Sequence, residues 1–178
     1  MIRKLVGCLR RFRNSQAGTA SLEFALCAPI VLVVFASAFE SGLLMLRSIM
    51  LDQAVDRTVR ELRLGHYLAP TADLLKTEIC KRGVILVDCN DNITVEMTRI
   101  STSTWSMPTT DIQCVDREED VNPVTALQIG QQNDVMLMRI CVIQDAILPA
   151  FGLAPYLELD GRGGYALFSN TAYVTDPS

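Results

Sequence analysis

The sequence predicts an α+β protein in which a long N-terminal membrane-spanning helix packs on a small antiparallel β-sheet. Three observations favour this fold class: an apolar segment near the N-terminus, an amphipathic segment directly after it, and several short runs of strand-like residues further on. A chain of 178 residues is long enough for one domain with a hydrophobic core and an appended segment. Two full domains are not expected.

The apolar segment covers residues 24–46 and contains one charged residue, Glu40. At about 1.5 Å per residue it spans roughly 35 Å, which exceeds the bilayer core of about 30 Å. Pro29 lies inside it, and membrane helices tolerate such breaks. A charge near mid-membrane costs about 2.5 kcal/mol or more, and less toward the interface. We therefore expect Glu40 to find a partner helix, to reach the interface or to be protonated.

Charge is divided unequally along the chain. Residues 1–18 hold five Lys or Arg residues and no acid, which leaves 11 of the 16 basic residues against all 20 acidic ones, a net charge of −9, in the remainder. A short basic flank before an apolar segment indicates a cytoplasmic N-terminus, so the acidic remainder is expected outside. The acidic remainder also argues against a nucleic-acid partner.

After the apolar segment, apolar residues recur at helical spacing: Leu51, Val55, Val59 and Leu62. Gly65 suits a helix C-cap, and Pro70 makes continuation of the helix unfavourable. We expect one long helix over residues 19–65, with a transmembrane half at about 24–46 and an amphipathic half that packs on an α+β domain formed by residues 66–178.

Within the α+β domain of residues 66–178, called here the outer domain, a short helix is expected to begin after Thr71 and to end near Gly83. Strand-like runs occupy residues 84–88, 93–100, 134–144 and 163–175. The first two runs are separated by "CNDN", whose Asn and Asp residues favour a tight turn, so the pair is predicted to form a hairpin.

Four cysteines fall in the outer domain: Cys80, Cys89, Cys114 and Cys141. Outside a membrane they are plausible disulfide candidates, and pairing 80 with 89 and 114 with 141 is the simplest of three connectivities. Buried reduced cysteines are the alternative. No CxxC spacing occurs, so neither zinc nor a redox centre is expected.

Residues that could support catalysis are scarce. His66 is the only histidine, and phosphate-loop, dinucleotide-binding and nucleophile-elbow motifs are absent from the sequence. An acidic cluster is formed by Asp116, Glu118, Glu119 and Asp120, whose spacing does not match an EF-hand loop and is typical of a solvated charge run. We expect no enzyme activity, no metal and no cofactor.

The stretch "QAGTASLEFALCAP" and its apolar and amphipathic continuation resemble the N-terminal region of TadE/TadG-like proteins, the pseudopilins of tight-adherence (Flp-type) pili. The shared pattern is a basic leader, a small residue, "ASLEFAL", a Pro five residues after Phe24, an apolar run and an amphipathic extension. It covers about residues 12–62. The resemblance implies a pilin-like fold and a role as a minor component in assembly of a tight-adherence type IV pilus.

The resemblance also implies cleavage by a prepilin peptidase between Gly18 and Thr19, so that residues 1–18 are a cytoplasmic leader. Glu23 and Phe24 become the fifth and sixth residues of the mature chain. On physical grounds Glu23 is an acid near a helix start, where the macrodipole favours it. The resemblance adds subunit registry, in which Glu23 faces the new α-amino group of a neighbouring subunit, since opposite charges attract strongly at low dielectric.

The implied partners are the prepilin peptidase, other pilin-like subunits, the inner-membrane platform of the pilus and membrane lipid. The implied location is the bacterial inner membrane, with a single pass and a periplasmic C-terminal domain. Two alternatives stay open. Signal peptidase could cut after the "ASA" triplet at residues 36–38, which would make Phe39 the first residue. The protein could also be a membrane-anchored or secreted binding or adhesion module, or an enzyme that depends on His66.

Overall fold

The computed structural model describes residues 19–67, 70–118, 126–149, 153–157, 160 and 162–175. The helices are α2 (Thr19–Arg63), α3 (Ala72–Arg82), α4 (Cys89–Asn92) and the 3-10 helix η2 (Ala154–Tyr156). The strands are β1 (Ile93–Ile100), β2 (Val135–Asp145) and β3 (Gly164–Val174). A long N-terminal apolar helix with a small antiparallel sheet confirms the predicted α+β fold class.

The long helix α2 contains 45 residues and continues through Pro29 without interruption. Its C-terminal end is a Schellman cap: the N–H of Gly65 donates to the C=O of Leu62 at 3.2 Å, and that of His66 donates to Glu61 at 3.1 Å. Gly65 has φ +70°, a conformation that glycine adopts without strain. The predicted C-cap is therefore confirmed.

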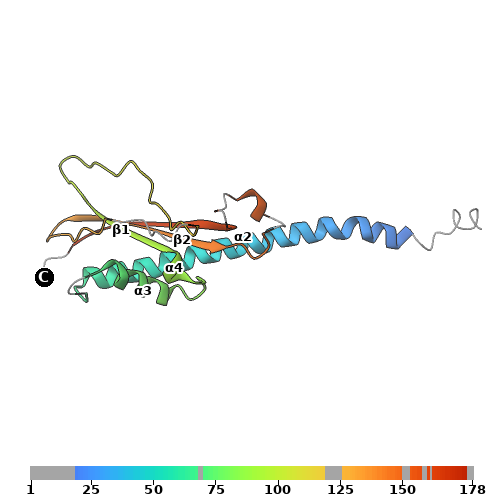
Figure 1. The fold of residues 1–178 in the computed structure, drawn as a ribbon, viewed down its shortest axis with the longest axis horizontal. Helices are drawn as coiled ribbons and strands as arrows, with labels where there is room; N and C mark the ends of the chain where they lie inside the picture. The colour runs from blue at the N-terminus through green and yellow to red at the C-terminus, as the bar shows by residue number, and fades with distance from the viewer. Residues whose placement is uncertain are drawn as a thin grey trace, which may run out of the picture.

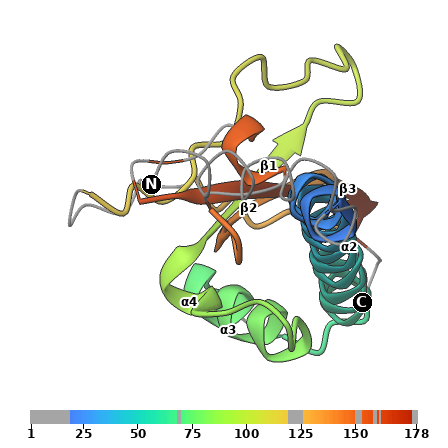
Figure 2. The same cartoon turned by 90° about the vertical axis from the view of Figure 1, so that its right-hand side faces the viewer.

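The sheet is an antiparallel meander with the order β1-β2-β3. Both helices α2 and α3 lie on one face of it, α2 beside β3 and α3 beside β1 (Figure 2). Alternate residues of β2 face the helices and are fully buried: Met136, Met138 and Ile140. They form one core with Leu51 and Val55 of α2, which confirms the predicted packing of the amphipathic half of the helix on the sheet.

The helix α2 is far longer than the sheet and projects beyond it (Figure 1). Every buried residue of α2 lies at position 40 or later. Within the described part of the chain, α2 is the one helix long and apolar enough to cross a membrane, and its most apolar window of 18 residues has no buried residue. The N-terminal part of α2 thus has little cover from the other described residues.

Two disulfides join the cysteines in the predicted sequential pairing. Cys80 is bonded to Cys89 and Cys114 to Cys141.

The short helix α3 also begins where predicted, because the Thr71 side chain accepts a hydrogen bond from the N–H of Leu74 at 3.2 Å.

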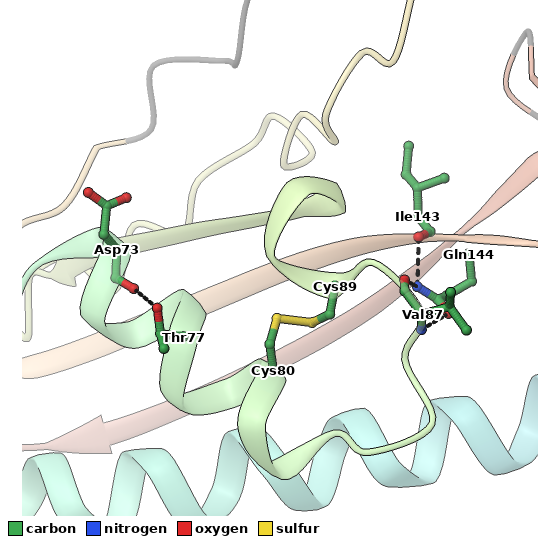
Figure 3. The surroundings of a disulfide bond; sticks show 7 residues. All are labelled: Asp73, Thr77, Cys80, Val87, Cys89, Ile143 and Gln144. Carbon is green, nitrogen blue, oxygen red and sulfur yellow. Dashed lines mark hydrogen bonds between the residues drawn. A yellow bond between two sulfur atoms is a disulfide. The ribbon is translucent and has the colours of Figure 1, made fainter.

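The predicted strand over residues 84–88 is wrong, and so is the hairpin it was expected to form. Residues 84–88 are mostly turns, and "CNDN" is the short helix α4. Val84 is 80% exposed and Val87 62% exposed, so the apolar run buries mainly Leu86. The Cys80–Cys89 disulfide therefore ties α3 to α4 rather than to a hairpin (Figure 3).

Gln144 of β2 explains why Val87 needs no neighbouring strand. Its buried amide accepts from the N–H of Val87 at 3.0 Å and donates to the C=O of Val87 at 2.9 Å (Figure 3). The side chain thereby satisfies both backbone groups that a strand would have paired.

Candidate functional site

Residues 19–39 of α2 present many exposed apolar side chains to the surroundings of the described chain. The exposed large side chains of this segment are Leu22, Phe24, Leu26, Ile30, Val31, Leu32, Val33, Val34, Phe35 and Phe39. A contiguous apolar surface of this kind marks contact with a membrane or with other proteins. Because all backbone hydrogen bonds in a helix are made within the helix, this segment can lie in the hydrocarbon core of a bilayer.

Glu23 lies within this surface as the fifth residue of α2 and is exposed. No described residue forms an ion pair or hydrogen bond with its carboxylate. Thr19, the first residue of α2, lies one turn earlier on the same face of the helix, about 6 Å along the axis. Glu23 lies outside the first turn of α2, which contains no acidic residue. Because the helix macrodipole acts mainly within the first turn, it stabilises the Glu23 carboxylate less than expected.

Of the predicted processing residues, Gly18 and the leader over residues 1–18 lie outside the described residues, whereas Thr19 begins α2. Phe24 is 73% exposed. The processing site and the registry role of Glu23 stay predictions.

Glu40 differs from its sequence-based expectation. Its side chain is fully buried, and Oε1 accepts a hydrogen bond from the N–H of Ile147 at 3.2 Å. Oε2 is buried with no hydrogen-bond partner among the described atoms. The covering group is the loop that follows β2 in the same chain, which lies against α2 where the helix leaves the sheet (Figure 1). A separate partner helix is therefore not needed to shield this carboxylate.

Arg47 lies seven residues after Glu40, on the same face of α2, and is also buried. Its Nη1 donates to the C=O of Asp145 at 2.8 Å and to the hydroxyl of Tyr165 at 2.6 Å. The guanidinium carbon is 5.9 Å from the centre of the Tyr165 ring, which permits a cation–π contact. Glu40 and Arg47 together form a polar clamp that fixes α2 to the end of β2.

Sequence reasoning did not identify Arg47 as a contact, because the first basic residue after an apolar run usually marks the end of a span. A useful signal was available: Glu40, Arg47 and Leu51 share one helical face with the amphipathic stripe.

A second polar cluster joins the C-terminal end of α2 to α3. Arg82 contacts Glu61 at 2.6 Å and Glu78 at 3.1 Å, and Tyr67 donates to Glu61 at 2.6 Å. The hydrogen bonds from Tyr67 and Arg82 lower the pKa of Glu61. Burial and the same carboxylate raise the pKa of Tyr67. These contacts orient α3 and are structural.

A third cluster is centred on Arg117, which is 12% exposed. It contacts Asp160 at 2.6 Å and Asp145 at 2.7 Å, and it lowers the pKa of Asp160 chiefly by hydrogen bonding. A Cβ at Gly164 would come too close to the ends of the Arg117 and Ile143 side chains, so any larger residue there would require these side chains to shift. The cluster holds the loop before β2, which contains Arg117, against the N-terminal end of β3.

The remaining candidates form no chemical centre in the described ranges. His66 is exposed, and its backbone takes part in the helix cap. Asp116 accepts from the N–H of Glu118 at 2.9 Å, while Glu119 and Asp120 lie outside the described residues. No group of three or more metal-ligating side chains occurs in the part of the chain that was described.

Comparison with known proteins identifies one matching segment. Residues 18–60 match the family model described as TadE-like protein, which confirms the predicted resemblance over that segment. The match begins at Gly18, includes Glu23, Pro29 and Glu40, and covers 43 of the 178 residues. No curated protein and no solved structure matches the chain.

Proposed function

We propose that this protein is a minor pilin-like component required for assembly of a tight-adherence type IV pilus, acting through membrane-embedded helix packing. The observation that carries the proposal is the coincidence of the TadE-like match with α2. Half of that matched segment is exposed apolar helix, a surface for lipid and neighbouring helices, and the other half is packed on the sheet domain.

The proposed location is the bacterial inner membrane. The N-terminal part of α2 crosses it, the leader is cytoplasmic, and the sheet domain is periplasmic. The basic N-terminus supports this orientation. The two disulfides on the other side of the span support an oxidising compartment. Partners are a prepilin peptidase, other pilin-like subunits, the pilus platform and lipid, and the protein acts as a structural component rather than as an enzyme.

Processing is proposed between Gly18 and Thr19. Cleavage there creates an α-amino group at the first residue of α2, on the helical face that carries Glu23. In lipid, Glu23 would be costly alone and favourable opposite such an amine on a neighbouring subunit. The exposure of Glu23, which forms no ion pair with another described residue, supports this registry role.

The first test is the mature N-terminus. We expect the purified native protein to begin at Thr19 and the Gly18→Leu variant to keep its leader, as measured by N-terminal sequencing and intact mass. A chain that begins at Phe39 would assign cleavage to signal peptidase, and one that begins at Met1 would exclude processing.

The second test separates Glu23 from processing. Glu23→Ala should be cleaved normally and should abolish or strongly reduce pili counted by electron microscopy. Asp56→Asn, which removes an exposed carboxylate from the same helix outside the span, is the matched control and should leave piliation normal. Normal piliation by Glu23→Ala would refute registry. Normal piliation in cells lacking the protein would favour the binding-module alternative.

A further inference from the structure

The helical face that carries Glu40 continues toward the N-terminus as the floor of an apolar groove. The groove has a volume of about 450 Å³ and is lined by α2 residues between Pro29 and Phe39 and by Leu148. Val33 and Ala36 line it and lie seven and four residues before Glu40, hence on the same face. The groove thus extends the packed face of α2 beyond the sheet.

The second wall comes from the loop formed by residues 146–149, the 146–149 loop. Ile147 is 50% exposed, Pro149 is exposed, and Leu148 lines the groove. The sequence from residue 146 to residue 157 contains no charged side chain. Further along that segment, Tyr156 is 85% exposed, and tyrosine is enriched where proteins meet the headgroup region.

The polar clamp fixes the position of the 146–149 loop. Glu40 binds the N–H of Ile147 and Arg47 binds the C=O of Asp145, so the start of the loop is attached to α2 at two points. Leu148 is the next residue and reaches the α2 surface on the membrane side of Glu40. The loop cannot move away from the helix without breaking these contacts.

We propose that the 146–149 loop inserts Ile147 and Leu148 into the membrane interface, and that lipid acyl chains fill the groove beneath Leu148. This inference rests on the proposed membrane anchorage of α2. The loop has backbone groups that the hydrocarbon centre would leave unpaired, so its depth is the boundary between headgroups and acyl chains. There it shields Glu40, whose carboxylate would otherwise face lipid.

The side chains of the groove favour lipid over a neighbouring helix. Membrane helices approach one another closely where small residues line the contact. The groove includes Leu32, Phe35 and Phe39, which are large and 49% to 70% exposed. Only Ala36 among the lining residues is small, so the groove itself lacks the row of small residues along which membrane helices approach closely, and its large side chains are well solvated by acyl chains.

The chain has one tryptophan, Trp105, which is 61% exposed and lies outside the groove. The variant Trp105→Phe therefore has no tryptophan fluorescence, and a single tryptophan can be introduced into it as a reporter. The reporter is Leu148→Trp in the full chain, reconstituted in phosphatidylcholine vesicles. Ile147→Trp is a second reporter in case the first variant misfolds. Quenching by lipids brominated at different acyl depths is then measured.

Two control reporters bracket the result. Val31→Trp lies on the exposed span. Val174→Trp lies at the opposite end of β3 from Gly164, which pairs with Asp145, about 33 Å further along the strand. We expect the loop reporter to be quenched at least twice as strongly as Val174→Trp, most efficiently by shallow bromines, and Val31→Trp to be quenched by deep bromines.

The outcomes separate this inference from the proposed function. Absence of quenching at Val31→Trp would overturn membrane anchorage, and the loop inference with it. Quenching at Val31→Trp but not at either loop reporter would overturn the loop inference alone. Protection of the loop reporters at high protein-to-lipid ratio, relieved by dilution with lipid, would assign the groove to a second copy of this chain instead of lipid.

Discussion

The carboxylate of Glu40 on α2 accepts a hydrogen bond from the backbone N–H of Ile147, 107 residues later in the chain. This contact joins the start of the packed half of α2 to the loop after β2. It places the boundary between covered and uncovered helix at residue 40, since no residue of α2 before Glu40 is buried.

Glu40→Gln and Glu40→Ala should differ in their effect on stability. Gln keeps an acceptor for the Ile147 N–H and removes a carboxylate whose second oxygen is buried without a partner, so stability should be retained or increased. Ala removes the acceptor and should cost about 1–2 kcal/mol. Denaturant unfolding of the detergent-solubilised chain, followed by near-UV circular dichroism, measures both. A larger loss with Gln than with Ala would contradict this account.

Arg47 and Tyr165 provide a second test of the polar clamp. Tyr165→Phe removes one acceptor from Arg47 but leaves the Asp145 carbonyl, and should cost about 1 kcal/mol. Arg47→Met should cost more, about 1–3 kcal/mol, because the buried Tyr165 hydroxyl and the part-buried Asp145 carbonyl both lose their donor. In the double variant the effects should be less than additive, since both changes remove one shared contact. Full additivity in the same unfolding assay would show that the two side chains act independently.

The features that sequence predicted correctly are those with a repeating local cause. The helical spacing of Leu51, Val55 and Val59 gives α2 its packed face, and alternation gives β1 its buried positions at Val95 and Met97. Both periods follow from backbone geometry alone. The Thr71 and Gly65 caps are equally local, because each satisfies backbone groups within a few residues.

The features that sequence missed depend on contacts between distant residues. Residues 84–88 have strand-like composition, but Gln144 supplies the hydrogen bonds of Val87 from more than 50 residues away. Glu40 was interpreted through its position in an apolar run, whereas its environment is set by Ile147. Composition could not reveal either partner, since β-propensity and burial depend on tertiary context.

The two disulfides should differ in their effect on stability. The Cys114–Cys141 pair spans 27 residues and Cys80–Cys89 spans nine. A chain-entropy estimate gives about 3.5 kcal/mol for the longer loop and about 2.5 kcal/mol for the shorter one. Paired Cys→Ser variants should therefore rank in that order in unfolding experiments. Cys27→Ser, at a free and exposed cysteine, is the control and should leave stability unchanged. An inverted ranking would show that strain or residual structure dominates loop entropy.

Asp160 should make the sheet domain sensitive to acid. Its carboxylate accepts from Arg117 at 2.6 Å and from the N–H of Gly164 at 2.6 Å, and the Arg117 hydrogen bond is the largest cause of its lowered pKa. A carboxyl group whose pKa is lower in the folded state contributes stability above its unfolded value, here 3.8, and that contribution is lost as the pH falls through the native pKa.

The variant Asp160→Asn should consequently be less stable than the native protein near neutral pH, and the difference should shrink as the pH is lowered from about 7 to about 3. Arg117→Met removes the same interaction from the other side and should reproduce the shrinking difference. Thermal unfolding of the full chain in detergent across this range provides the measurement. A difference that stays constant with pH in both variants would mean that packing around Arg117, rather than its charge, holds the loop before β2 against β3.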